Sequence, residues 1–155
     1  MRDTVGMEPA DRLLAVTTYA FDISVLEIFL PLLHGAATIV LPRERAADPA
    51  ALAEAIRAYA PTVMQATPAT WRMLLETGWK GHGKLKILCG GEAWGGELAE
   101  RLLERCGSLW NMYGPTETTI WSTAGRVTSG GPVLIRGPVA NTRLYVLDGR
   151  GEPAP

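Results

Sequence analysis

Residues 62–68 read Thr-Val-Met-Gln-Ala-Thr-Pro, and they are the most informative part of the sequence for the fold class. The run 62–66 is mostly apolar and does not alternate regularly with polar residues, which is typical of a parallel strand covered on both faces. Thr67 and Pro68 then supply a helix start, because Thr caps a helix and Pro fits its first position. The stretch therefore predicts a buried strand that passes directly into a helix.

The same arrangement recurs along the chain. Four further apolar runs predict strands at residues 13–17, 37–41, 85–89 and 109–113. Helices are predicted at residues 25–34, from Asp48-Pro49 to Tyr59, from Thr67-Pro68 to Gly78, and at residues 97–105. Strands that alternate with helices of about ten residues indicate βαβ units. The predicted fold class is therefore α/β, with a mainly parallel sheet of about five strands.

The last part of the chain has a different composition. Residues 127–138 are rich in Gly, Pro and Ser, which predicts a loop. Residues 141–147 alternate weakly and predict one partial strand. We therefore divide the chain into an α/β unit at residues 1–126 and an irregular segment, a loop with a partial strand, at residues 127–155.

Composition excludes several classes of protein. Apolar residues make up 47% of the 155 residues, which is enough for a globular core. The 15 basic and 16 acidic residues leave no excess of positive charge, so we expect no nucleic-acid partner. No apolar run reaches the roughly 20 residues of a membrane span. Two cysteines, Cys89 and Cys106, fit neither a disulfide scaffold nor a zinc site. We expect a soluble, cytoplasmic protein with reduced thiols and no membrane partner.

Polar and glycine residues follow four of the predicted strands, at residues 19–24, 65–68, 90–93 and 113–119. Ligands bind at the carboxyl ends of strands in open parallel sheets, so this edge is the candidate site. Asp22 is either a helix N-cap or the partner of a cationic group such as an ammonium. Gly90-Gly91 is either a tight connection or a close backbone approach to a ligand. Thr116 and Glu117 either begin a helix or contact phosphate and Mg²⁺.

Four motifs in one order are more specific than any of them alone. Residues 111–119 read Asn-Met-Tyr-Gly-Pro-Thr-Glu-Thr-Thr, which resembles the signature N-x-Y-G-P-T-E of amino-acid adenylation domains in nonribosomal peptide synthetases. Residues 21–25, Phe-Asp-Ile-Ser-Val, resemble a second core motif of that family, F-D-x-S. Residues 65–71 and 90–93 resemble its connecting segments. The resemblance covers essentially the whole chain.

The resemblance implies a flavodoxin-like three-layer sandwich with helices on both faces of the sheet. It also implies membership of the adenylate-forming superfamily, whose members activate an amino acid with ATP and Mg²⁺ to an aminoacyl-AMP. The acyl group then passes to the thiol of phosphopantetheine on a carrier protein. By the resemblance, Asp22 and the Gly114 carbonyl would hold the substrate ammonium, Tyr113 would pack on adenine, Thr116 would contact phosphate and Glu117 would bind Mg²⁺. The adenine site would be lined by Asn111 and by the backbone of Gly91, Glu92 and Ala93.

The resemblance also maps a wall around the substrate side chain: Ile23, Leu26, Gln65, Leu88, Gly90, Met112, Ile120 and Trp121. Large residues among these would fill most of the space. No second charge is present to pair with a charged side chain, which would be costly to bury alone. A small substrate is therefore predicted, with glycine first and alanine second.

Several motifs of the family are absent from the sequence. They are the Ser/Thr/Gly-rich phosphate loop ending in Pro-Lys-Gly, the later ribose-binding Asp, and the catalytic Lys of the C-terminal lid. We therefore expect a substrate-selecting subdomain that is inactive alone and works with the remainder of an adenylation domain. Two alternatives remain, a non-catalytic binding module and a fragment of an acyl- or aryl-CoA synthetase. Asp22 argues against the second, because a carboxylic acid without an ammonium gives this carboxylate no partner.

Overall fold

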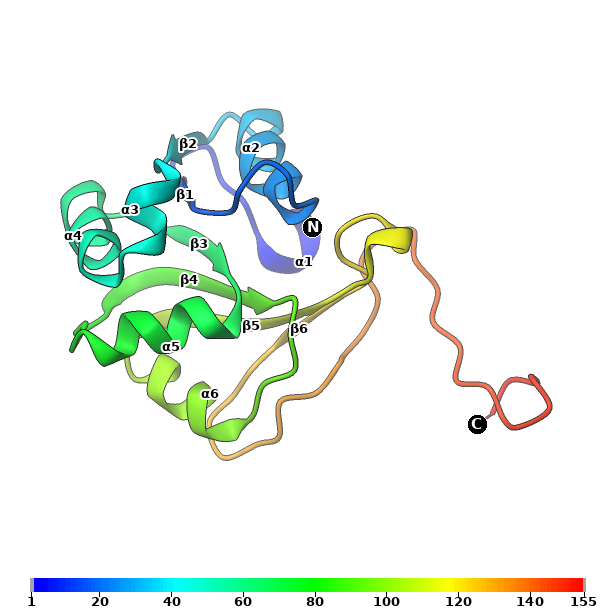
Figure 1. Cartoon of the computed structure of the whole chain (residues 1–155). Coiled ribbons are helices and arrows are strands. Elements are labelled where there is room, and N and C mark those ends of the chain that lie inside the picture. Colours follow the sequence, from blue (N-terminus) through cyan, green and yellow to red (C-terminus); the bar gives the residue numbers. More distant parts are fainter. Residues whose placement is uncertain (1, 155) are drawn as a thin grey trace.

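The computed structural model describes residues 2–154 and contains a six-stranded sheet (Figure 1). Its strands are β1 (Arg12–Ala15), β2 (Ala37–Val40), β3 (Val63–Ala66), β4 (His82–Gly90), β5 (Cys106–Tyr113) and β6 (Thr123–Arg126). Their spatial order is β2-β1-β3-β4-β5-β6, with β6 antiparallel to β5 and all other pairs parallel. The first five strands thus have the flavodoxin-like order, with its switch point between β1 and β3.

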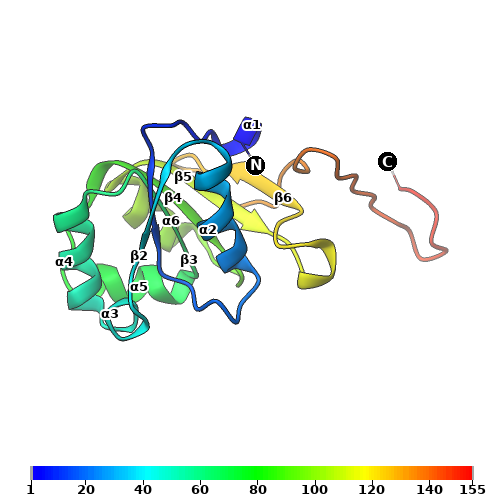
Figure 2. The ribbon, with the colours of Figure 1, turned by 90° about the horizontal axis from the view of Figure 1, so that it is seen from above.

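Helices cover both faces of this sheet (Figure 2). They are α1 (Arg2–Val5), α2 (Ile23–Leu33), α3 (Arg43–Ala47), α4 (Pro49–Tyr59), α5 (Pro68–Glu76) and α6 (Gly96–Leu103), with a 3₁₀ turn η1 (Thr116–Thr118). One core cluster joins α4, α5 and α6 to the sheet, and a second joins α1 and α2 to its other face. The predicted three-layer α/β sandwich is confirmed.

Strand β3 shows why the apolar runs do not alternate. Met64 and Ala66 belong to the cluster beneath α4, α5 and α6, and Val63 belongs to the cluster beneath α1 and α2. All four β3 side chains are buried. A strand with a helix layer on each side has no solvent face, so neither of its side-chain sets needs to be polar.

The two predicted helix starts with Pro at the first position are also confirmed. The Asp48 carboxylate accepts hydrogen bonds from the backbone N–H groups of Ala50 at 2.9 Å and Ala51 at 3.3 Å, at the start of α4. The Thr67 hydroxyl accepts one from the Thr70 N–H at 3.4 Å, at the start of α5. In both helices Pro follows the cap, where its missing N–H costs nothing.

The last part of the chain differs from the prediction in two ways. Strand β6 was not predicted, because Thr-Ala-Gly-Arg is short and has little strand propensity. The partial strand predicted at 141–147 is wrong: that segment forms only an isolated bridge between Leu147 and Pro153, and it runs away from the sheet in Figure 1. Its apolar side chains are exposed, so weak alternation there reflects no buried face. The loop at 127–138 is confirmed, whereas the division at residue 126 stays a prediction.

Both cysteines are free thiols, as expected. Burial raises the pKa of Cys89 and raises that of Cys106 to about 11, so neither is a reactive thiolate at neutral pH. Within residues 2–154, no helix combines the length and apolar character that crossing a membrane requires.

Candidate functional site

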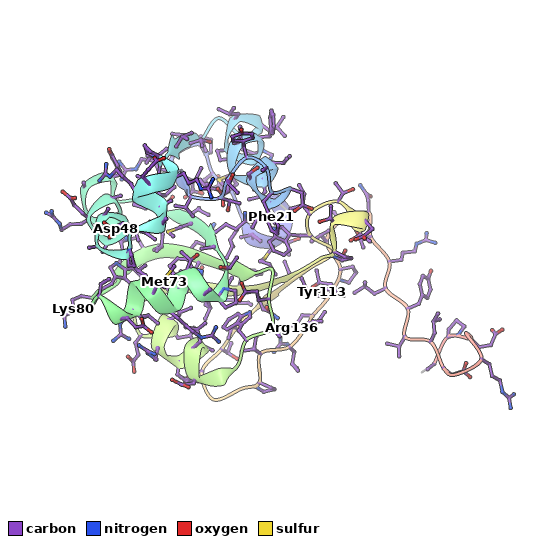
Figure 3. All side chains as sticks on the ribbon, in the orientation of Figure 1. Phe21, Asp48, Met73, Lys80, Tyr113 and Arg136 are labelled. Atoms are coloured by element: carbon purple, nitrogen blue, oxygen red, sulfur yellow. The ribbon has the colours of Figure 1, made fainter. Side chains whose placement is uncertain are left out.

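The polar segments predicted to form a site do meet at the carboxyl edge of the sheet. They follow β1, β3, β4 and β5, whose parallel arrangement places their ends on the same side. Figure 3 shows Phe21 and Tyr113 at this end of the molecule and Lys80, which precedes β4, at the opposite end. The edge contains two adjoining parts, an open cavity and a closely packed wall.

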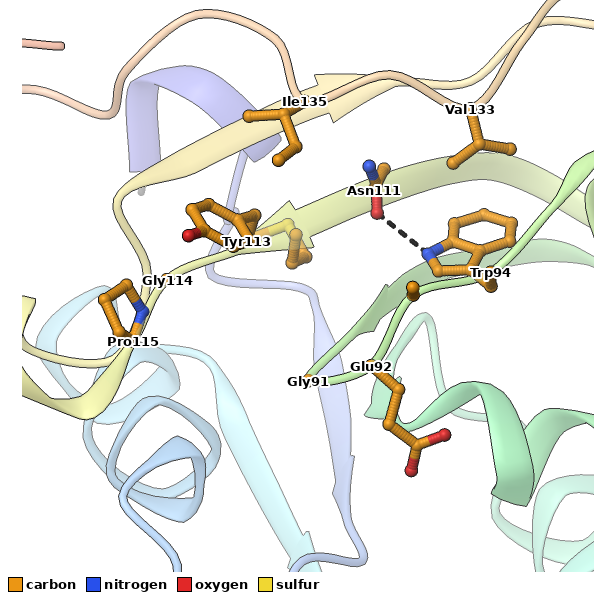
Figure 4. Close-up of a pocket in the computed structure, with 11 residues that line it drawn as sticks. Gly91, Glu92, Trp94, Asn111, Tyr113, Gly114, Pro115, Val133 and Ile135 are labelled. Atoms are coloured by element: carbon orange, nitrogen blue, oxygen red, sulfur yellow. Dashed lines mark hydrogen bonds between the residues drawn. The ribbon is translucent and has the colours of Figure 1, made fainter. Parts of the chain in front are cut away.

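The cavity has a volume of about 460 Å³ and lies between the ends of β4 and β5 (Figure 4). Its lining comprises Gly91, Glu92, Ala93, Trp94, Asn111, Met112, Tyr113, Gly114, Pro115, Val133 and Ile135. All five residues predicted to line an adenine site do line this cavity. Four lining residues were missed: Trp94, Pro115, Val133 and Ile135. The last two come from the Gly- and Pro-rich loop. Its sequence has no periodic pattern that would predict a contact with the sheet.

Asn111 holds two walls of this cavity together. Its Oδ1 accepts a hydrogen bond from Trp94 Nε1 at 2.8 Å, and its Nδ2 donates one to the Leu134 carbonyl at 3.0 Å. The connection after β4 and the loop after β6 are therefore fixed to the same side chain on β5. The oxygen and the NH₂ group of the Asn111 amide each retain one further hydrogen-bonding position, so Asn111 can still contact a ligand.

The predicted side-chain wall is brought together as well. Ile23, Leu26, Leu88, Met112 and Trp121 belong to one buried cluster, and Ile120 packs against it. Gln65 is fully buried and hydrogen-bonds to two members of this wall. At Gly90 an added Cβ would lie 2.7 Å from Trp121 Cη2. All eight predicted wall residues therefore form one contact set.

A chain of buried hydrogen bonds runs behind this wall. Trp121 Nε1 donates to Gln65 Oε1 at 2.8 Å, and Gln65 Nε2 donates to the Ile23 carbonyl at 2.9 Å and to Glu27 Oε1 at 3.2 Å. Glu27 also accepts from the N–H groups of Val16 and Thr17, each at 3.0 Å, and from the Thr17 hydroxyl at 2.6 Å. Trp121, Gln65, Glu27 and Thr17 are thus all paired within this network, as buried polar groups require.

Glu27 is the main residue of this site that sequence reasoning missed. Burial raises its pKa above the usual value, and the hydrogen bonds from Thr17, Gln65 and Val16 act in the opposite direction. It is the only charged residue of α2, whose other ten residues are apolar except Ser24. A single carboxylate inside an apolar helix was the available signal.

The loop between β5 and β6 sets the position of Trp121. Thr119 and Ile120 have positive φ values of 65° and 71°, which β-branched residues rarely adopt. At Gly114 an added Cβ would lie 2.6 Å from Trp121 Cα, so only glycine allows the loop to return this closely. Strained residues of this kind cluster at functional sites, where the surrounding structure holds them.

Asp22 does not act as a helix cap. It occupies the N-cap position of α2, yet its carboxylate makes no capping hydrogen bond. Nor does it form an ion pair with another residue in the described range 2–154. A half-exposed carboxylate at a helix start, without a protein partner, is available to a cationic ligand.

Thr116 and Glu117 lie exposed on the turn η1, beyond the cavity. The described residues hold no cluster of three or more His, Cys, Asp or Glu that could bind a metal ion. A single carboxylate nevertheless fits Mg²⁺, which often takes one or two protein carboxylates together with substrate phosphates and water.

The family model described as "AMP-binding enzyme" matches residues 1–155. The chain belongs to the AMP-binding enzyme family. A PKS-NRPS hybrid synthetase of Aspergillus candidus is 44% identical over 156 residues, which cover 100% of this chain and 6% of that protein. The chain thus spans only a small part of such relatives.

The solved structures similar to this chain include two that contain a glycine-derived ligand or glycine itself. One is a holo four-domain nonribosomal peptide synthetase bound to AMP and glycine, with 49% identity, a TM-score of 0.96, and coverage of 100% of this chain and 12% of the other. The second is the Vibrio cholerae adenylation domain AlmE in complex with glycyl-adenosine-5′-phosphate, with 26% identity, a TM-score of 0.88, and coverage of 99% and 31%. The resemblance to adenylation domains of nonribosomal peptide synthetases is confirmed.

The contrast between Asp48 and Asp22 can be tested by unfolding in urea. Asp48→Ala removes two capping hydrogen bonds, so we expect it to lower the free energy of unfolding by about 1 kcal/mol. Asp22→Ala removes no such bond and loses only a charge near the helix start, so we expect less than about 0.5 kcal/mol at physiological salt. Equal losses in the two variants would show that Asp22 caps α2 after all.

Proposed function

We propose that this chain is the substrate-selecting part of an amino-acid adenylation domain that activates glycine. In the complete domain, the glycine carboxylate attacks the α-phosphate of ATP, giving glycyl-AMP and pyrophosphate. The phosphopantetheine thiol of a carrier protein then attacks the acyl carbon, which forms the thioester and releases AMP.

One arrangement in the structure carries the proposal. An open cavity adjoins a wall whose side chains pack closely together, and the carboxylate of Asp22 beside them has no protein partner.

The cavity is the proposed nucleotide site. The Tyr113 side chain is about half exposed beside it, which leaves a ring face for stacking on adenine. The backbone of Gly91, Glu92 and Ala93 forms the opposite rim, where polar groups can meet the edge of a base. Asn111 holds that rim through Trp94 and offers its remaining amide positions to the ligand.

The amino acid is proposed to lie with its ammonium at Asp22. The carboxylate there has no protein partner, and a charge-assisted hydrogen bond to an ammonium would supply one. The Gly114 carbonyl is the proposed second acceptor. The same residue contacts the backbone of the Trp121 segment, so the ammonium site and the wall would be set by one loop.

Glycine is proposed because the wall leaves little space. Leu26 and Trp121 are at most 5% exposed, Met112 is 2% exposed, and Gln65 is completely buried. A larger substrate would have to displace packed side chains, at a typical cost of about 1–3 kcal/mol. The two solved structures described above contain glycine with AMP and glycyl-adenosine-5′-phosphate, which supports the same choice. Alanine is the second candidate, since one methyl group gives only about 1–3 kcal/mol of discrimination.

Thr116 and Glu117 are the proposed phosphate and Mg²⁺ contacts. Both side chains are exposed on η1 and make no hydrogen bond to another described residue, so they are available to a ligand. Bound Mg²⁺ would offset negative charge on the triphosphate during attack. The phosphate loop, ribose-binding Asp and lid Lys of the family would come from other parts of the adenylation domain.

A segment exchange tests the proposed substrate. Residues 1–155 would replace the equivalent segment of a complete adenylation domain that prefers a bulky amino acid, and ATP–pyrophosphate exchange would be measured with all twenty amino acids. We expect glycine to give the highest rate and alanine the next. The 155-residue chain alone is the matched control, and we expect no glycine-dependent exchange from it. A bulky amino acid leading in a folded chimera would refute the proposed wall.

Replacing Asp22 tests the proposed ammonium contact. Asp22→Asn in the chimera keeps the size of the side chain and removes its charge. We expect kcat/KM for glycine to fall at least about 30-fold, because the substrate ammonium loses the carboxylate that would pair with it. Urea unfolding of the 155-residue variant should change little. Retention of glycine activity by Asp22→Asn would assign the ammonium to another group.

A further inference from the structure

Glu27 lies behind the proposed substrate wall, completely buried in the middle of α2. Its carboxylate receives hydrogen bonds from the Val16 N–H, the Thr17 N–H, the Thr17 hydroxyl and the Gln65 amide. Both carboxylate oxygens are therefore used only as acceptors. The proposed reaction gives this carboxylate no chemical role, so its role lies in the groups that it holds in place.

We propose that Glu27 is a positioning residue that sets the size of the side chain accepted by the site. It holds the Gln65 amide in one orientation, and through that amide it holds the Trp121 indole against Gly90. This inference rests on the proposed function and concerns the selectivity of the same site.

The direction of the hydrogen bonds allows only one arrangement. An indole N–H is a donor only, so Trp121 requires the oxygen of the Gln65 amide. The Gln65 NH₂ group then faces the Ile23 carbonyl and Glu27, which are both acceptors. If the amide were turned over, the Gln65 NH₂ group would face the Trp121 N–H, so two donors would meet. The Gln65 oxygen would then face the oxygens of Ile23 and Glu27. Such mismatches are costly in a buried site.

The position of the indole ring determines the free space. Gly90 is buried at the end of β4, and an added Cβ there would lie 2.7 Å from Trp121 Cη2. A small rotation of the ring away from Gly90 would open room for a methyl group. The hydrogen bond at the indole N–H is the polar contact that opposes this rotation, and Glu27 fixes the acceptor that makes it.

Glu27 also connects this wall to the segment that carries Asp22. It accepts the N–H groups of Val16 and Thr17, which directly follow β1 and precede the loop to α2. One carboxylate therefore fixes both the proposed ammonium segment and the proposed side-chain wall. A glutamine has the same shape but carries a donor at one of the two positions, so it cannot accept all four hydrogen bonds.

The test uses Glu27→Gln in the chimeric adenylation domain described above, with kcat/KM measured for glycine and alanine. The new NH₂ group would face the Gln65 NH₂, so Gln65 would turn and Trp121 would lose its acceptor. We expect the alanine-to-glycine ratio of kcat/KM to rise about 2- to 10-fold, as for the loss of one hydrogen bond. Glu100→Gln is the matched control, because Glu100 is an exposed carboxylate that bonds only to Ser129 and Gly130. Its ratio should equal that of the wild type.

A double-mutant cycle separates positioning from a general effect on folding. Gln65→Met keeps the volume of the side chain and removes both amide contacts, so it should raise the ratio by itself. In the Gln65→Met background, adding Glu27→Gln should change the ratio no further. An unchanged ratio in folded Glu27→Gln, or full additivity of the two substitutions, would overturn the role of Glu27. If Glu27→Gln does not fold, an unchanged ratio in Gln65→Met overturns it.

A second readout does not depend on activity. In the ¹⁵N-tryptophan-labelled 155-residue chain, Glu27→Gln should shift the indole N–H resonance of Trp121 and leave that of Trp94 in place, since Trp94 bonds to Asn111. A resonance of Trp121 that does not move would contradict the proposal even if the chimera is inactive. Conversely, a shifted resonance in the 155-residue chain, together with a chimera that prefers a bulky amino acid, would refute the proposed substrate and leave the positioning role intact.

Discussion

The hydrogen bonds of the Gln65 side-chain amide hold the candidate site together. Gln65 is the one polar side chain of β3, and its two ends reach different elements: Trp121 before β6 on one side, and Ile23 and Glu27 of α2 on the other. An unpaired buried amide would cost about 1–3 kcal/mol, so removing any of the three partners would destabilise this arrangement. The hydrophobic wall packs around this arrangement, which explains how apolar side chains that could repack are held in one geometry.

The sheet topology places the two halves of the site side by side. Met112 at the end of β5 lines the open cavity and also belongs to the buried cluster of the wall. A nucleotide in the cavity and an amino acid against the wall would therefore meet at the end of β5, next to Gly114. This is the carboxyl edge of a parallel sheet. The ends of several strands meet there, and their backbone groups and side chains are available to a ligand. The proposed reaction needs its two substrates at this junction.

Elements with a strong local cause were predictable from the sequence. The β3–α5 unit has a run buried on both faces and a Thr-Pro helix start, and it forms as predicted. The resemblance to adenylation-domain motifs named residues 91–93, 111 and 113 as an adenine site, and the structure places all five beside one cavity. Strand β6 and the lining residues Val133 and Ile135 were not predicted. Tertiary contacts place them. Asn111 donates a hydrogen bond to the Leu134 carbonyl, and β6 pairs with β5, a pairing that the sequence of β6 does not predict. Glu27 was missed because burial of a carboxylate depends on four donors from distant positions.

The proposed function requires that this edge hold an aminoacyl-adenylate with almost no space beyond the α-carbon. The most direct measurement is the affinity of a complete adenylation domain carrying this segment for three non-hydrolysable sulfamoyl-adenosine analogues, with glycyl, alanyl and phenylalanyl groups. We expect the glycyl analogue to bind most tightly, the alanyl analogue roughly tenfold or more weakly, and the phenylalanyl analogue far more weakly. Equal affinity for the glycyl and phenylalanyl analogues would contradict this requirement, because the wall around Trp121 would then not limit the substrate.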